Sequence, residues 1–292
     1  MFVLAHLSDL HMALRPRLLE LAGKRGLGYI NWHRGRKYIH LRETLASITQ
    51  DVKSLATDHV AVTGDLVNLS LPREYAAARA WLETLGPPHG VTVIPGNHDA
   101  YVRSALGGPE KYWGDYMRGD DGAPSGTFPF VRRRGNVALI ALSSALPTGP
   151  FMATGLVGEA RLARLAQALE QTSGLFRVVL IHHPPESPPS RHLRRLVDGA
   201  EFRRVLAVHG ADLVLHGHDH CRAILWLDGP DKKIPAVGAP SASARTAHRH
   251  ENAAGYNLFQ IAAEGNVRRC EMLARELGRD GSVGEVGRQV LL

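Results

Sequence analysis

The chain has 292 residues, of which 44% are hydrophobic, two cysteines and a formal net charge of +7 at pH 7. This length fits one large α/β domain or two small ones, and no apolar run approaches the ~18 residues that mark a membrane span. Two cysteines exclude a disulfide framework and favour a reducing cytoplasm. The positive charge favours anionic partners such as phosphate esters, nucleic acid or lipid headgroups, although an arginine-rich proteome would produce the same charge.

The first half of the chain is predicted to alternate strands and helices. Residues 2–8 are expected to form a strand rather than a signal peptide, because no basic region precedes the apolar run. Residues 12–40 form a basic insertion in which Tyr29 and Trp32 are interspersed. Apolar periodicity and turn residues then predict a helix over 41–55, a strand over 58–64, a helix over 70–85, a strand over 91–94 and an irregular stretch over 100–130.

The second half continues the alternation and then changes to consecutive strands. The predicted elements are a strand over 137–142, a helix over 156–169, a strand over 176–181, a basic helix over 192–208, and strands over 211–215, 223–227, 234–237, 256–261 and 267–273. Residues 275–292 are Gly-rich and charged, and we expect them to form a loosely held tail. Because no linker divides the chain, residues 1–274 are predicted to form one domain.

Five of the predicted strands lead directly into side chains of the types that bind metals. These side chains are Asp9 and His11, then Asp65, then Asn97, His98 and Asp99, then His182 and His183, and finally His216, His218 and His220. In layered α/β folds, sites form where the carboxyl ends of strands open into loops. The five groups together therefore predict one shared metal centre.

Each group taken alone has an ordinary structural explanation. Gly96-Asn97 is a common tight-turn pair, Asp65 after a glycine could cap a turn, and His182-His183 could lie in an extended loop. The run from His216 to His220 is the strongest signal, because alternate residues of a strand point the same way and imidazole is the commonest neutral metal ligand. The presence of all five groups favours the metal centre over these separate explanations.

The complete set resembles the calcineurin-like metallophosphoesterase superfamily over roughly residues 2–270. The motifs that carry the resemblance are Asp9-x-His11, Gly64-Asp65-x-x-Asn68, Gly96-Asn97-His98-Asp99, His182 and Gly217-His218-x-His220. The His-His-Pro-Pro sequence at 182–185 resembles the bacterial branch with class III cyclic nucleotide phosphodiesterases and glycerophosphodiesterases. The resemblance implies a four-layer α/β/β/α sandwich of two mixed sheets flanked by helices, with a dinuclear metal site at the carboxyl ends of the strands.

The resemblance also implies a role for each motif residue. The first ion would be held by Asp9, His11 and His220, the second by Asn97, His182 and His218, and both by Asp65. The family pattern favours His182 over His183 as the ligand; whether His183 or His216 touches a metal stays open. His98 is the candidate catalytic group that stabilises the transition state or protonates the leaving alkoxide, with Asp99 fixing its orientation.

The donor set and the family imply the chemistry. Nitrogen and oxygen ligands without a thiolate suit Mn, Fe, Co or Zn, and two such ions would let a metal-bridging hydroxide attack an anionic phosphate ester. The expected activity is that of a phosphodiesterase, with cyclic nucleotides and glycerophosphodiesters as candidate substrates. The alternatives are a nuclease, a nucleotide-lipid pyrophosphatase, or a non-catalytic scaffold of the same fold.

The basic insertion at 12–40 follows His11 directly and is expected to lie near the mouth of the site. It could act as a lid, or as a contact for anionic lipid or nucleic acid. A solvated basic segment that packs its aromatic side chains inward explains the same composition. No DNA-reading motif accompanies the basic residues, so a nuclease function is the less favoured hypothesis.

Overall fold

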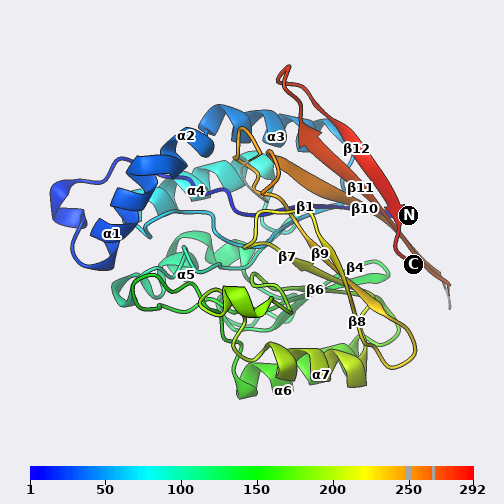
Figure 1. Ribbon diagram of the computed structural model, residues 1–292. Coiled ribbons are helices and arrows are strands. Elements are labelled where there is room, and N and C mark those ends of the chain that lie inside the picture. The colour runs from blue at the N-terminus through cyan, green and yellow to red at the C-terminus, as the bar shows by residue number, and fades with distance from the viewer. Residues whose placement is uncertain (248–250, 265–266) are drawn as a thin grey trace.

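Two six-stranded sheets form the centre of the molecule in the computed structural model, which describes residues 1–247, 251–264 and 267–292 (Figure 1). In spatial order, the first sheet contains β12 (Val283–Val290), β11 (Val267–Leu277), β10 (Gly255–Glu264), β1 (Phe2–Leu7), β2 (His59–Val62) and β3 (Val91–Val93). The second contains β4 (Phe130–Arg134), β5 (Val137–Ala141), β6 (Phe176–Leu180), β7 (Leu213–His216), β9 (Ile234–Gly238) and β8 (Ile224–Leu227). Both sheets are mixed, because β1–β2–β3 and β5–β6–β7–β9 pair in parallel and the remaining pairs are antiparallel.

Helices cover the outer faces of the two sheets, as Figure 1 shows. The helices are α1 (Lys24–Asn31), α2 (Lys37–Ile39), α3 (Arg42–Ser54), α4 (Pro72–Leu85), α5 (Gly108–Trp113), α6 (Glu159–Gln171) and α7 (Gly199–His209), with a π-helical turn at Trp32–Arg36 and 3₁₀ turns at Leu18–Glu20, Arg103–Ala105, Gly114–Tyr116 and Pro189–Arg191. α3 and α4 lie beside the first sheet, whereas α6 and α7 cover the second. The predicted four-layer sandwich is confirmed. In the described part of the chain, no helix is both long enough and apolar enough to cross a membrane.

The alternation of side chains along the inner strands explains why two apolar layers form. In β5, Leu139 joins the buried cluster that includes Leu4 and other side chains of the first sheet. The next residue, Ile140, points to the opposite face and joins the cluster that contains Leu165 of α6 and Leu206 of α7. Because both faces of such strands are buried, their sequences are continuous apolar runs.

The C-terminal residues differ from the expectation of a loosely held tail. β11 continues to Leu277, and β12 returns antiparallel to it as the edge strand of the first sheet. Gly281, in the turn between these two strands, has φ +83°. Glycine adopts such a positive φ more easily than any other residue. The side chain of Leu291 is only 5% exposed. The Gly-rich composition therefore marks a hairpin turn, and the prediction of a loose tail over 275–292 was wrong.

The basic helix predicted over 192–208 also begins later than expected. Helix α7 starts at Gly199, and its preceding residue Asp198 accepts hydrogen bonds from the backbone N–H groups of Val157 (3.0 Å) and Gly158 (2.7 Å). This carboxylate anchors the chain before α7 to the chain before α6. Arg194 consequently lies outside the helix, where it lines the cavity described below.

Candidate metal centre

The carboxyl ends of β1, β2, β3, β6 and β7 carry all the predicted ligands to one edge of the two sheets. Backbone hydrogen bonds join the loops that follow these strands: Asp9 N–H donates to Gly64 O (3.0 Å), His11 N–H to Asp65 O (2.9 Å), and Gly217 N–H to His182 O (3.0 Å). The last of these bonds connects loops of the second sheet. The His218 N–H donates to the Asp9 carboxylate (2.9 Å) and so ties the two sheets together.

The backbone at these strand ends is strained at most of the predicted ligands. Non-glycine residues rarely adopt the left-handed region, and they persist there only where the surrounding structure enforces it. Left-handed φ values occur at Asp9 (55°), His11 (46°), Asp65 (54°), His218 (70°) and His220 (53°). Such outliers cluster at functional sites, and here they turn side chains toward a common centre.

Two glycines let these loops approach one another. A Cβ atom at Gly217 would overlap the side chains of Ser8 and Asp9. A Cβ atom at Gly96 would overlap the carboxylate of Asp65. The glycines of the Gly-Asn-His-Asp and Gly-His motifs are thus required by close packing around the two carboxylates.

The predicted ligands of the first ion form one buried cluster. The Nε2 atoms of His11 and His220 lie 2.9 Å apart. Asp9 Oδ1 lies 3.3 Å from Nε2 of His220 and 3.8 Å from Nε2 of His11. Two imidazole nitrogens and one carboxylate oxygen therefore converge on a single point.

The predicted ligands of the second ion form a neighbouring cluster. Nε2 of His182 lies 3.2 Å from Asn97 Oδ1 and 3.4 Å from Asp65 Oδ2. Its Nδ1 donates to the carbonyl of Thr63 (2.6 Å), which directs Nε2 toward the cluster. The ring of His218 lies 5.2 Å from that of His182. Donor atoms of Asp9, Asp65 and His182 lie within 4.8 Å of one another, so the two clusters adjoin.

The donor chemistry of the two clusters fits divalent metal ions. Every side chain offers nitrogen or oxygen, as Mn, Fe, Co and Zn accept. Nε2 of His218 is buried and has no hydrogen-bond partner in the described part of the chain. Buried polar atoms are almost always paired in proteins. A buried imidazole nitrogen without a hydrogen-bond partner, among the donor atoms of other histidines, is what a cation-binding site leaves on the protein side.

The electrostatics of the site keep both carboxylates charged. Burial opposes ionisation of Asp65, but the charges of His182 and His98 hold its pKa below the ordinary value. Burial likewise opposes ionisation of Asp9, and His220 lowers its pKa. Burial alone would lower the pKa of both histidines, yet Asp65 raises that of His182 to about 9, and Asp9 raises that of His220 to about 9. Without a metal, each histidine therefore pairs as a cation with its carboxylate, and a bound metal ion would take the place of the histidine's proton.

His98 lies beside the clusters, but Asp99 does not orient its ring as we expected. Nδ1 of His98 donates to the carbonyl of Asn68 (2.6 Å), and its backbone N–H donates to Asp65 (2.7 Å). Both carboxylate oxygens of Asp99 instead accept backbone N–H groups, from Val67 (3.0 Å) and Gly96 (2.8 Å). Burial and the charge of Asp65 raise the pKa of Asp99 to about 8. Asp99 therefore positions the loop, and the Asn68 carbonyl orients His98.

His183 and His216 make further ring contacts, and His183 also adjoins the second cluster, because donor atoms of His182, His183 and His218 lie within 4.8 Å of one another. Nδ1 of His183 lies 2.8 Å from Ser144 Oγ, and its Nε2 lies 3.2 Å from the carbonyl of Ala153. Burial lowers the pKa of His183 to about 3, so the ring is neutral. Nδ1 of His216 contacts the carbonyl of Gly217 at 3.2 Å. His182, whose Nε2 faces Asn97 and Asp65, stays the predicted ligand of this pair.

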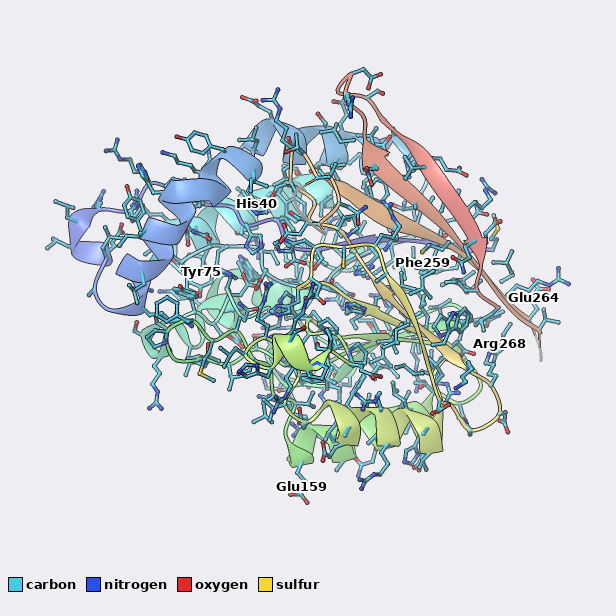
Figure 2. The ribbon with its side chains drawn as sticks, viewed as in Figure 1. His40, Tyr75, Glu159, Phe259, Glu264 and Arg268 are labelled. Carbon is cyan, nitrogen blue, oxygen red and sulfur yellow. The ribbon has the colours of Figure 1, made fainter. Side chains whose placement is uncertain are left out.

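Three residues at the site have no motif around them, and the sequence did not single them out. His40, labelled in Figure 2, follows α2 at the end of the basic insertion, and its ring lies 4.7 Å from that of His11. Glu251 Oε2 lies 3.3 Å from Nδ1 of His220. Arg194 faces a cavity of about 50 Å³ at the centre of the site. The position of His40 and Arg194 in basic stretches was the only available signal.

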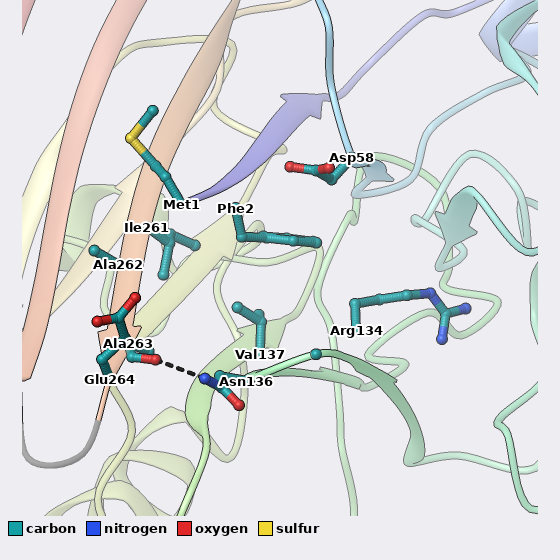
Figure 3. Close-up of a pocket in the computed structure, with 11 residues that line it drawn as sticks. Met1, Phe2, Asp58, Arg134, Asn136, Val137, Ile261, Ala262, Ala263 and Glu264 are labelled. Atoms are coloured by element: carbon teal, nitrogen blue, oxygen red, sulfur yellow. Dashed lines mark hydrogen bonds between the residues drawn. The ribbon is translucent and has the colours of Figure 1, made fainter.

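A second cavity, of about 450 Å³, lies at the opposite ends of the strands (Figure 3). It is bounded by the start of β1, the end of β10 and the turn between β4 and β5. Asn136 Nδ2 donates to the carbonyl of Ala263 (2.8 Å), and Val3 N–H donates to Asp58 (2.7 Å). None of the metal-type clusters found among the described residues lies here.

Comparisons with known proteins identify the family of the chain. The model of the calcineurin-like phosphoesterase family matches residues 2–222. A Synechococcus sp. protein named "Probable cyclic nucleotide phosphodiesterase" is 28% identical over 227 residues, which cover 76% of this chain and 79% of the relative. A purple acid phosphatase from yellow lupin superimposes on 97% of this chain with a TM-score of 0.61 and 13% identity. This chain spans 52% of the length of that phosphatase, and the likeness shows the fold alone.

Proposed function

The chain belongs to the calcineurin-like phosphoesterase family, and from that premise we propose that it is a dinuclear metal-dependent phosphodiesterase. The observation that carries this proposal is the convergence of two adjoining donor clusters from five strand ends. The convergence buries two carboxylates and strains the backbone at five residues, and both of these features oppose folding. A binding role for the clusters explains why that strain is retained.

The seven motif residues would hold the two ions. Asp9, His11 and His220 suit one ion, Asn97, His182 and His218 suit the other, and Asp65 lies where it can serve both. Two divalent ions bound there would lower the pKa of water and neutralise charge on the phosphoryl oxygens. The shell contributes only two carboxylates, so the loaded site would keep net positive charge. That charge favours an anionic ester.

His98 would move the proton of the leaving group. Its Nδ1–H donates to Asn68 O, and the proton exchange with a leaving alkoxide would take place at Nε2. The ring of Tyr101 stacks on His98 with centroids 5.4 Å apart and holds its plane. Arg194, which faces the same cavity, would contact a phosphoryl oxygen.

The preference for a diester rests on the Synechococcus relative, which carries the name of a cyclic nucleotide phosphodiesterase. Cyclic nucleotides and glycerophosphodiesters are the candidate substrates. A non-catalytic scaffold would have no use for a complete ligand set, which makes the catalytic role the better account.

The test is metal-dependent turnover. After chelation, the protein should be inactive, and reconstitution with Mn²⁺ should restore hydrolysis of bis-p-nitrophenyl phosphate in preference to the monoester p-nitrophenyl phosphate. A reconstituted protein that binds Mn²⁺ yet hydrolyses neither ester would contradict a catalytic role. A protein that prefers the monoester would contradict the diesterase assignment alone.

A further inference from the structure

A large cavity of about 620 Å³ opens directly beside the metal centre. Asn97, His98 and Arg194 line both this cavity and the small central one. Its other walls are α1 from the basic insertion and the loop at 150–153. The volume is in the range that accommodates a small organic ligand. Any substrate whose phosphate reaches the metal centre can therefore extend a substituent into this cavity, which we call the side pocket.

The walls of the side pocket are apolar and open to solvent. Exposed fractions are 43% for Leu27, 47% for Ile30, 84% for Phe151 and 39% for Met152. Apolar side chains gathered around one cavity at a catalytic centre mark a binding surface rather than a scattered surface residue. Phe151 also has φ +62°, a strained conformation that the loop maintains while its ring stays exposed.

The contacts of Tyr101 argue against a nucleobase stacked on that ring. Tyr101 stacks on His98 at an interplanar angle of 13°, and the Lys24 ammonium lies 4.3 Å from the centre of the same ring. A base that stacked on Tyr101 would have to displace one of these neighbours. Apart from Phe151, the remaining apolar lining is aliphatic, which suits a flexible hydrocarbon.

The charged side chains that line the side pocket are basic. Arg194 and His98 lie at the end shared with the metal centre, and Lys24 donates to Thr148 Oγ1 (3.0 Å) beside Tyr101. None of the described residues that line the pocket carries a carboxylate. A molecule with an anionic phosphate at one end and an apolar chain at the other matches this arrangement.

We propose that the side pocket binds the alkyl or acyl chain of an amphiphilic phosphodiester and thereby selects lipid-like substrates. This inference rests on the proposed function, because the phosphate must be held at the metal centre for the chain to reach the pocket. Among the candidate substrates, it favours glycerophosphodiesters that carry an apolar chain over cyclic nucleotides.

The experiment is a chain-length series of alkyl p-nitrophenyl phosphates, from methyl to octyl, assayed below their aggregation concentrations with the Mn²⁺-reconstituted protein. We expect kcat/KM to rise by up to about fourfold for each methylene that becomes buried, and by about tenfold or more over the series. Equal kcat/KM for methyl and octyl esters would overturn the inference.

A binding measurement separates this inference from the proposed activity. Calorimetric titration should show octyl phosphate binding about tenfold or more tightly than methyl phosphate. Chain-length-dependent binding without any turnover would support the pocket and contradict the diesterase. Turnover of every ester with equal binding of both phosphates would support the diesterase and overturn the pocket.

A matched pair of variants locates the chain. Ile30→Asp places a charge in the pocket wall on α1, whereas Val208→Asp places one on α7, where Val208 is 63% exposed. We expect Ile30→Asp to abolish the preference for octyl over methyl esters and Val208→Asp to retain it. Thermal unfolding measurements should show that both variants are folded. A preference retained in Ile30→Asp would overturn the assignment of the chain to this pocket.

A vesicle-binding experiment distinguishes whether the ester comes from a membrane lipid or from a soluble amphiphile. Leu18 and Leu19 are 90% and 97% exposed in the insertion, next to Arg15 and Arg17. Cosedimentation with phosphatidylglycerol vesicles that is lost in a Leu18→Asp/Leu19→Asp variant would identify a membrane lipid. No cosedimentation, with the chain-length preference intact, would identify a soluble amphiphile; both results support the pocket.

Discussion

The two ends of the central sheets each border a cavity, and the two cavities differ in chemistry. At the amino ends of β1 and β5, polar groups are paired in ordinary ways, as with Asn136 and the Ala263 carbonyl (Figure 3). At the carboxyl ends, ligand-type side chains crowd together on strained backbone, and Nε2 of His218 is left without a partner in the described part of the chain. A cavity alone does not mark a functional site. Strained backbone and a convergence of buried ligand-type side chains at its wall do.

The largest expected effect at the carboxyl ends is that of Asp65→Asn. Asp65 lies between the two clusters and is ionised, so its loss should lower kcat/KM by about 10³- to 10⁵-fold and reduce metal content. Assays on bis-p-nitrophenyl phosphate with elemental analysis measure both. The matched control at the amino ends is Asp58→Asn, which should stay within about twofold of the wild type. Equal losses of kcat/KM in the two variants would contradict the conclusion that only the carboxyl ends of the strands form a functional site.

The next effect is that of His98→Ala, which tests whether His98 acts on substrate or on metal. We expect turnover to fall by about 10²- to 10⁴-fold, as for removal of a general acid, while metal content is unchanged. A variant that loses metal as well would place His98 among the ligands.

A pH-dependent stability effect is expected of Glu74, which supports the loop after Asp65. Its carboxylate accepts N–H groups of Leu69 (2.8 Å) and Leu71 (3.1 Å), and burial raises its pKa from 4.5 to about 7. The folded state therefore holds the proton more tightly than the unfolded state, so this contribution is complete below pH 4.5 and is lost as the pH rises to 7.

The Glu74→Gln variant should lack this loss. Its free energy of unfolding relative to the wild type should increase by up to about 3 kcal/mol between pH 4.5 and pH 8. Urea unfolding of the metal-free proteins at several pH values measures the difference. A difference that does not change with pH would show that Glu74 titrates normally.

The smallest effect is expected of Asn136→Ala at the amino ends. Loss of one hydrogen bond to the Ala263 carbonyl should cost about 1 kcal/mol of stability and leave diesterase activity within about twofold of the wild type. Thermal unfolding and the standard assay test this together. A large loss of activity would assign this cavity a part in catalysis.

Much of the fold was predictable because many of the buried strands are continuous apolar runs, and five strands end in a motif. The strand β12 was not, since its Gly-rich sequence has little apolar character and it forms by pairing with β11. The start of α7 at Gly199 depends on Asp198, whose carboxylate contacts chain about 40 residues away. Such contacts leave no local pattern in the sequence.

The motif residues of the site were predictable because their order along the chain is itself a pattern. Their assignment to individual ions stays a prediction. His40 and Arg194 could not be found in this way, because each reaches the site from a basic stretch without a motif. The role first given to Asp99 was wrong because a sequence does not show whether a buried carboxylate faces a side chain or the backbone.

The claim that five strand ends form one dinuclear centre is tested most directly by metal stoichiometry. Chelated protein, titrated with Mn²⁺ in a calorimeter and checked by elemental analysis, should bind two ions per chain. The Asp65→Asn variant should bind fewer. Binding of no ions, or an unchanged stoichiometry of two in that variant, would contradict the claim.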